Sequence, residues 1–194
     1  MTPVDSSPNP PTDPPGRPRR ADARRNYELL LTAARELFDV RGVDVPLDDI
    51  ARRAGIGNAT MYRHFPTRQD LIVAVYADEV TALCAHGEAL LADDSPGDAL
   101  FTWLGAFVAH AAAKRDLALA LSGGARRSAL FDTWHRAMHD TAAALLTRAQ
   151  RSGAVRTDID HSDLVSLANG IALTGPDPDR AERLLGIVRT GTGP

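Results

Sequence analysis

Apolar residues recur every three or four positions from about residue 21 to the end of the chain. This spacing places them on one face of an α-helix, whereas a half-buried strand would alternate apolar and polar residues. Alternation of that kind is absent, and alanine, which favours helix more than any other residue, is abundant. The pattern therefore predicts an all-α protein with about nine helices.

The first helix is predicted to end at Gly42, since glycine readily adopts the left-handed conformation of a helix cap. A second helix should begin at Pro46, because proline is tolerated in the first turn. A turn at residues 55–57 separates it from a short third helix, which we expect Asn58 to cap and His64 to end. The first helix is expected to bury a stripe made of Leu29, Leu30, Ala33, Ala34, Leu37 and Phe38.

The rest of the chain is predicted to form longer helices. Thr67 should cap a fourth helix that begins at Arg68. Ser95 should cap a fifth that begins at Pro96. Further helices are expected at about residues 116–121, 126–151, 162–173 and 179–189.

Charge and composition narrow the function classes. The net charge of −3 argues against a protein that coats nucleic acid by bulk charge. Residues 17–70 carry 11 arginines and 8 acidic side chains, whereas residues 71–194 carry 11 basic and 15 acidic ones. A positively charged N-terminal region is suited to local phosphate contacts, although surface charge varies as much between regions of ordinary proteins.

Cys84 is the single cysteine, so no internal disulfide forms. With no secretory signal and no apolar run near the roughly 20 residues of a span, a cytoplasmic protein without membrane contact is predicted.

The most informative segment is Leu47–Phe65, LDDIARRAGIGNATMYRHF. Two short helices joined by a glycine turn, with another helix before them, are typical of a helix-turn-helix motif. Ile50, Ala51 and Ala54 give the first of the two a small inner face, and Gly55 allows the turn a positive φ. The next helix projects groups suited to base edges and phosphates: Asn58, Thr60, Tyr62, Arg63 and His64.

About 55 residues resemble the DNA-binding domain of the tetracycline-repressor (TetR) family. The residues that carry the resemblance are Ala33, Leu37, Phe38, Gly42, Asp49-Ile50-Ala51, Ala54-Gly55, Tyr62-Arg63-His64-Phe65 and Leu71. Residues 1–18 hold seven prolines and almost no large apolar residues, so this tail is predicted to be disordered. For the rest, the resemblance implies a helix-turn-helix domain at 19–67 and a helical effector-binding and dimerisation domain at 68–194. It also implies a homodimer that binds a pseudo-palindromic double-stranded DNA operator.

The same resemblance assigns roles to residues of the head. The third helix would enter the major groove, where Asn58, Thr60, Tyr62 and His64 would contact bases and phosphates. Phosphates would also be held by Arg68, Arg24 and Arg25. Arg19 and Arg20 would form a minor-groove arm or an inert charged linker. The chain departs from the family at Pro46-Leu47, where a phosphate-binding threonine is usual; the backbone amides of Asp48 and Asp49 would have to replace it.

In the body, the family places a small-molecule effector between helices four to seven. Residues expected there are Trp103, Phe107, His110, Trp134 and Met138, together with His139; aromatic residues at this spacing also form ordinary core. Such a pocket favours an uncharged or hydrophobic effector. His135 and His139 stand at the spacing of a zinc pair, but no third ligand is suitably placed, so neither a metal nor a cofactor is predicted.

The last two helices carry apolar stripes made of Leu164, Leu167, Ala168 and Ile171, then Leu184, Leu185 and Val188. In the family these helices pair with their symmetry mates as a four-helix bundle; packing within one subunit is the alternative.

The predicted function is a repressor that a small-molecule effector releases from its operator. A ligand-independent DNA-binding activator or architectural regulator would share these features. The chain has no glycine-rich phosphate loop, nucleophile elbow or metal-ligand cluster, so an enzyme is not predicted.

Overall fold

The structure is a computed structural model that describes residues 18–113 and 125–193. These residues form helices and short connections without strands, so the all-α prediction is confirmed. The predicted short helix near 116–121 and most of the proline-rich tail lie outside the described residues, although the first helix already begins at Pro18. The helices are α1 (Pro18–Arg41), α2 (Leu47–Ala54), α3 (Asn58–His64), α4 (Arg68–Leu90), α5 (Pro96–Ala113), α7 (Ala125–Arg151), α8 (His161–Leu173) and α9 (Pro178–Thr192).

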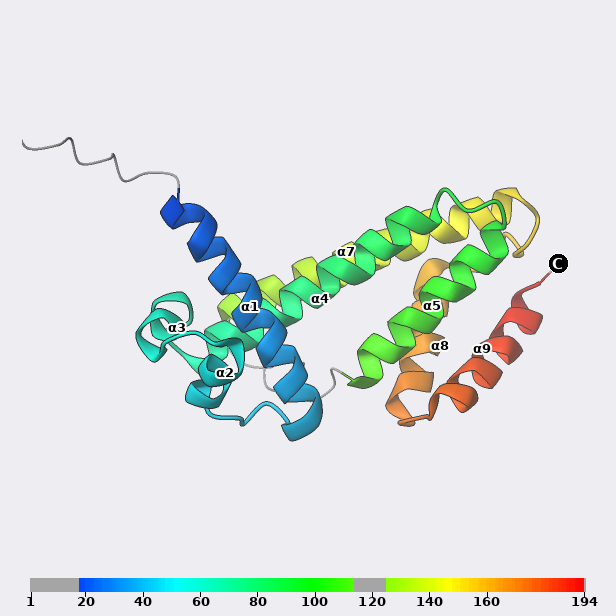
Figure 1. The fold of residues 1–194 in the computed structure, drawn as a ribbon. Coiled ribbons are helices and arrows are strands. Elements are labelled where there is room, and N and C mark those ends of the chain that lie inside the picture. The colour runs from blue at the N-terminus through cyan, green and yellow to red at the C-terminus, as the bar shows by residue number, and fades with distance from the viewer. Residues whose placement is uncertain (1–17, 114–124, 194) are drawn as a thin grey trace, which may run out of the picture.

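The helices form a head and a body that share the long helix α4 (Figure 1). Helices α1, α2 and α3 form the head, and α4 packs against α1 there. Further along, α4 packs against α5 and α7, while α5 packs against α8 and α9. In Figure 1, α3 and α9 lie at opposite ends of the molecule.

The predicted helix ends depend on local chemistry and are mostly confirmed. Gly42 and Gly55 have φ of +76° and +69°, the region that favours glycine. Thr67 and Asp70 form a reciprocal capping box at the start of α4. The prediction that Asn58 caps α3 is wrong: Gly57 is the N-cap without a side-chain hydrogen bond, and Asn58 is the first helical residue. Asn58 thereby has its side chain exposed on the surface of the head.

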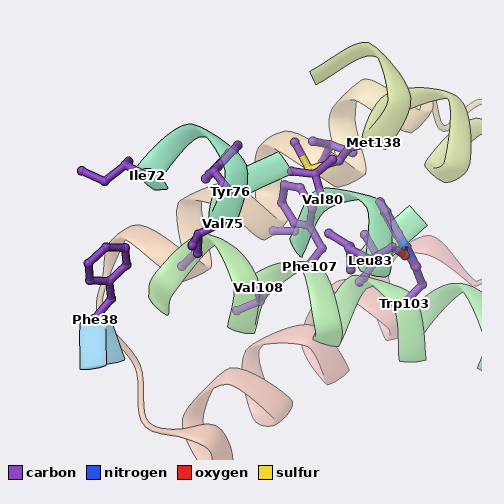
Figure 2. Close-up of a cluster of buried hydrophobic side chains, with 14 of the residues drawn as sticks. Phe38, Ile72, Val75, Tyr76, Val80, Leu83, Trp103, Phe107, Val108 and Met138 are labelled. Atoms are coloured by element: carbon purple, nitrogen blue, oxygen red, sulfur yellow. Dashed lines mark hydrogen bonds between the residues drawn. The ribbon is translucent and has the colours of Figure 1, made fainter. Parts of the chain in front are cut away.

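One continuous apolar core runs from the head into the body. Met61 and Ile50 lie at its head end, and Trp103 and Leu145 lie in the body. Figure 2 shows side chains of α4, α5 and α7 packed against each other along this core. The prediction that Leu29 is buried is wrong, since its side chain is 40% exposed and Leu31 is buried instead. The cause is a small rotation of the buried face of α1 relative to the predicted stripe.

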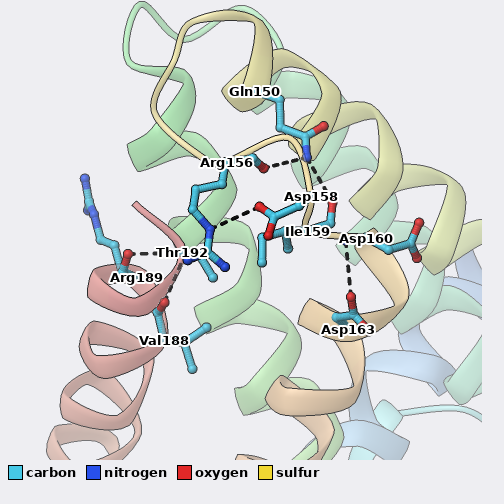
Figure 3. A network of polar contacts seen from close by, with 9 residues as sticks. All are labelled: Gln150, Arg156, Asp158, Ile159, Asp160, Asp163, Val188, Arg189 and Thr192. Carbon is cyan, nitrogen blue, oxygen red and sulfur yellow. Dashed lines mark hydrogen bonds and ion pairs between the residues drawn. The ribbon is translucent and has the colours of Figure 1, made fainter. Parts of the chain in front are cut away.

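The ends of α7, α8 and α9 meet in a polar network (Figure 3). The side-chain amide of Gln150 donates to the carbonyl oxygens of Arg156 and Ile159, each at 2.9 Å. Asp160 and Asp163 form a capping box at the start of α8. The backbone N–H of Arg156 donates to the carbonyl of Thr192 at 3.0 Å, which fixes the end of α9 to the α7–α8 connection.

Candidate nucleic-acid interface

Helix α3 is held against the head by its inner face and leaves its outer face free. Met61 is fully buried, and Phe65 directly after the helix is buried as well. The backbone N–H of Ile56 donates to the carbonyl of Ala51 at 2.9 Å and closes the turn from α2. The outward residues of α3 are Asn58, Thr60, Tyr62, Arg63 and His64, of which Thr60 and His64 are half-buried and the others exposed. The structure thus gathers the predicted DNA-binding side chains on one short helix.

Tyr62 is 45% exposed and is held in place by a residue of α2. Its hydroxyl donates to Oδ1 of Asp48 at 3.2 Å. The negative charge of Asp48 is the main cause that raises the pKa of the Tyr62 hydroxyl. The hydroxyl has a single O–H, which Asp48 accepts here, so a contact to a phosphate oxygen would have to replace this hydrogen bond.

His64 belongs to a small aromatic group that sequence reasoning missed. Its ring lies 6.1 Å from the ring of Tyr27 on α1, in an edge-on arrangement, and Tyr27 lies 5.2 Å from Phe65. Burial raises the pKa of the Tyr27 hydroxyl, with a smaller contribution from Asp78. Tyr27 places a second phenol ring beside α3, against His64 and Phe65. An aromatic residue on the polar side of the first helix was the available sequence signal.

The ion pairs of the head join its helices. Asp49 accepts from Arg52 at 2.6 Å and from Arg41 of α1 at 3.1 Å, and these two hydrogen bonds lower its carboxyl pKa. Arg53 of α2 pairs with Glu36 of α1 at 2.7 Å. The backbone amide of Asp49 donates to the carbonyl of Pro46 at 3.0 Å. That amide is not free for a phosphate, so of the two backbone amides expected to replace the missing threonine, the structure removes that of Asp49 and leaves that of Asp48 as a prediction.

Two protein-family models match this chain. Residues 30–75 match the model of bacterial regulatory proteins of the tetR family, and residues 95–194 match the model of the C-terminal domain of SbtR-like transcriptional regulators. The chain belongs to the TetR family of transcriptional regulators. The expected TetR resemblance is confirmed beyond the head, because the second match covers most of the body.

Two solved TetR regulators resemble the chain over most of its length. The one from Mycobacterium vanbaalenii is 39% identical, with a TM-score of 0.75, covering 91% of this chain and 100% of that one. The one from Streptomyces coelicolor is 37% identical, with a TM-score of 0.73, covering 87% and 98%. An HTH-type transcriptional regulator of Staphylococcus aureus is 35% identical over 68 residues, so the match spans 34% of this chain and 37% of that relative.

The arginines predicted to hold phosphates have different environments in this TetR protein. Arg24 pairs with Glu28 at 3.0 Å, and both side chains are exposed. Arg25 is exposed and has no ion-pair partner among the described residues. Arg68 is half-buried and donates to the carbonyls of Val43 (2.8 Å) and Val45, so it fixes the α1–α2 connection to α4. This structural role of Arg68 was not predicted. The side chains of Arg19 and Arg20 lie outside the described part.

The residues expected around an effector lie together in the body, mostly as tightly packed core. Trp103 is 0% exposed, and its indole N–H donates to the carbonyl of Leu83 at 3.0 Å. Phe107 and Met138 are buried too. His110 and Trp134 flank the buried ring of Tyr76, with centroids 5.6 and 5.0 Å away. The structure therefore brings all five residues around α4, α5 and α7.

A hollow of about 740 Å³ lies on another side of α5, between α5 and α9. None of the five predicted effector residues lines it. Its walls come mainly from α5 and α9, including Phe101, Gly105 and Leu185. Sequence reasoning missed this hollow, because it searched for aromatic clusters and the hollow has mostly small residues.

The described residues give no support to metal binding or to a membrane-spanning helix. Within residues 18–113 and 125–193, no group of three or more histidine, cysteine or acidic side chains is placed to hold a metal ion. His135 lies beside His139, and burial is the main cause that lowers its pKa. Within the same ranges, no helix has the length and apolar character needed to cross a membrane.

Proposed function

We propose that this TetR-family protein is a homodimeric repressor that binds a pseudo-palindromic operator and is released by a small-molecule effector. It would act in the cytoplasm, as a regulator and not as an enzyme, with a DNA-binding domain up to residue 67 and a helical body from residue 68. The observation that carries the proposal is the exposed polar face of α3, presented by a helix whose opposite face is fixed by Met61.

DNA binding follows from the chemistry of that face. Asn58 can pair with adenine and Arg63 with guanine in the major groove, where base edges are distinguishable. Tyr62 can donate to a phosphate oxygen by exchanging its hydrogen bond to Asp48 for one to the phosphate. Arg24 and Arg25 lie exposed on α1 and are suited to phosphates further along the duplex.

Dimerisation is supported by apolar side chains that the single chain leaves uncovered. Leu167 of α8 is 50% exposed and Ile187 of α9 is 68% exposed. A Cβ added at Gly170 or Gly191 would meet nothing within 4 Å, so another helix can approach closely there. Pairing of α8 and α9 with their symmetry mates would bury these side chains and give the two-fold symmetry of a palindromic operator.

Release by an effector requires a ligand with different affinities for the DNA-binding conformation and for another one. The helices offer a physical connection: α5 packs against α4, and α4 packs against α1 of the head. The Arg35–Asp78 ion pair joins α1 to α4 at that contact. A shift of α4 would therefore move the head, and with it the spacing of two α3 helices in a dimer.

The test begins with selection of an operator from a random DNA library by the full chain. A palindromic consensus bound in the presence of competitor DNA is expected, and failure to enrich any sequence would contradict the proposal. A reporter placed behind the selected operator should fall in expression when the protein is produced; a rise would indicate an activator instead. Light scattering should give a dimer that Ile187→Glu dissociates, whereas the matched exposed change Glu88→Gln should not.

A further inference from the structure

The hollow between α5 and α9 has the size of a small-molecule site. Its volume of about 740 Å³ falls within the usual range for such sites, roughly 300–1,000 Å³. Pro176 and Pro178, at the turn before α9, contribute to its wall. In Figure 1 the two helices run beside each other, with α9 on the side of α5 that is away from α4.

The floor of the hollow is lined mostly by small and apolar residues. Gly105 and Ala109 of α5 line it, and so do Leu185 and Gly186 of α9. A Cβ added at Gly105 would lie 3.8 Å from Cδ1 of Leu185, and one at Gly186 would meet nothing within 4 Å. Open space therefore lies beside Gly186, whereas Gly105 is already within van der Waals range of Leu185, and Phe101 forms an aromatic wall.

The charged residues that line the hollow differ in whether they have an ion-pair partner. Arg189 pairs with Asp98 at 2.5 Å, and its guanidinium lies 5.5 Å from the ring centre of Phe101. Glu182 also lines the hollow and has no ion-pair partner among the described residues. Seven helical residues separate Glu182 from Arg189, a rise of about 10 Å. The hollow thus combines an apolar floor about two helical turns long with one uncompensated carboxylate.

We propose that this hollow binds an amphipathic organic cation, with an apolar body against Gly105, Ala109 and Leu185 and an ammonium group at Glu182. The carboxylate attracts a cation and repels an anion, while the paired Arg189 offers little to an anionic ligand. This ligand class differs from the uncharged effector expected for the aromatic cluster around Trp103.

The location of the hollow gives the ligand a regulatory consequence, which rests on the proposed function. At 100° per residue, Ile187 points to a different side of α9 from Glu182, Leu185 and Arg189. A ligand would therefore leave the face of Ile187 free and instead change the separation of α9 from α5. Because α5 packs on α4, occupancy of the hollow should alter operator affinity.

The test uses the full chain and three probes of similar size: 1-naphthylmethylamine, 1-naphthylmethanol and 1-naphthoate, titrated by calorimetry at pH 7. The amine should bind most tightly and the carboxylate most weakly. Glu182→Gln should weaken the amine about three- to fivefold, as expected for a partly exposed ion pair, and leave the alcohol unchanged. Asp179→Asn, on the same helix but outside the hollow, should change neither.

Several results would overturn the site. These are equal binding of amine and carboxylate, no effect of Glu182→Gln, or no binding of any probe below about 1 mM, the limit of weak specific binding. Gly186→Leu should fill the hollow and abolish binding of all three while circular dichroism stays helical, since leucine favours helix over glycine. Retained binding in that folded variant would place the probes elsewhere.

Operator affinity measured with and without saturating amine separates this inference from the proposed function. Altered affinity that Glu182→Gln diminishes supports both. Unchanged affinity overturns the regulatory consequence and leaves the binding site standing. If the chain fails to bind any operator, the proposed function is wrong, and the calorimetric titration still decides the site.

Discussion

Tyr62 of α3 and Trp103 of α5 are both aromatic residues on helices, yet they lie in opposite environments. Tyr62 is 45% exposed and its hydroxyl is tethered by a single hydrogen bond to Asp48. Trp103 is 0% exposed, and its N–H is bonded to the buried backbone of α4. The head thus offers its aromatic and polar groups to a partner, whereas the body uses its own to hold three helices together. Loss of Tyr62 should therefore affect binding, and loss of Trp103 should affect folding.

The largest expected effect is on Trp103. Trp103→Ala leaves a large cavity and removes the indole hydrogen bond to the Leu83 carbonyl, so it should lower the free energy of unfolding by about 3–5 kcal/mol. Urea unfolding followed by circular dichroism measures this change. A loss below about 1 kcal/mol would show that Trp103 is not core and would restore it as a candidate effector contact.

Gly87→Ala tests how tightly the helices around Trp103 are packed. A Cβ at Gly87 would lie 2.2 Å from Cγ2 of Thr141 and 2.8 Å from Nε1 of Trp103. Such overpacking should cost about 1–3 kcal/mol of unfolding free energy. Gly186→Ala, which meets nothing within 4 Å, is the matched control and should be neutral or stabilising.

Thr141→Ser sharpens the Gly87 test, because it removes the methyl group that the new Cβ would strike. The double variant should recover part of the stability lost in Gly87→Ala. Additive losses in the double variant would contradict the packing described here.

Tyr62→Ala is the counterpart in the head. It should weaken operator binding by about 1–3 kcal/mol and leave the thermal unfolding of the protein nearly unchanged. Fluorescence anisotropy with labelled operator measures the first and calorimetry the second. Tyr62→Phe keeps the ring, so an equal loss in that variant assigns the effect to the hydroxyl. Unchanged affinity in Tyr62→Ala would reject the assigned role.

Asp48→Asn should have a smaller effect of the opposite sign. The substitution keeps an acceptor for the Tyr62 hydroxyl but removes a negative charge beside the proposed DNA-binding surface. Operator binding should become tighter by about 0.5–1 kcal/mol at low salt, and the gain should shrink as salt screens it. Weaker binding would show that the carboxylate itself is needed to position Tyr62.

The smallest effect concerns pH. Hydrogen bonds from Arg52 and Arg41 hold the pKa of Asp49 below its usual value. A lowered folded-state pKa contributes stability above the unfolded-state pKa, and that contribution is lost as pH falls through the folded value. The urea midpoint of the wild type should therefore fall more between pH 6 and pH 3 than that of Asp49→Asn. Equal falls would contradict the assignment.

Short-range chemistry made much of the fold predictable. The Thr67 cap and the bends at Gly42 and Gly55 follow from residues that act within a few positions of themselves. The exposed face of α3 was predictable as well, since Met61 and Phe65 mark its buried side. These features explain why the family could be suspected from the head alone.

Contacts between distant residues could not be predicted in the same way. Asp48 and Tyr62 are 14 positions apart, and Arg68 and Val43 are 25 apart, so only packing of the helices brings them together. Helix α5 is apolar nearly all round, so its periodicity does not distinguish the face of Trp103, in the core, from that of Gly105, in the hollow. The predicted effector site and the observed hollow differ for this reason.

The central claim, that the outer face of α3 binds a specific DNA sequence, is tested most directly by measuring affinity for the selected operator and for a scrambled duplex across a salt series. The account predicts roughly a thousandfold preference or more for the operator at physiological salt, and a steep fall in affinity between about 50 and 200 mM salt. Equal affinity for both duplexes, or affinity that does not change with salt, would contradict it.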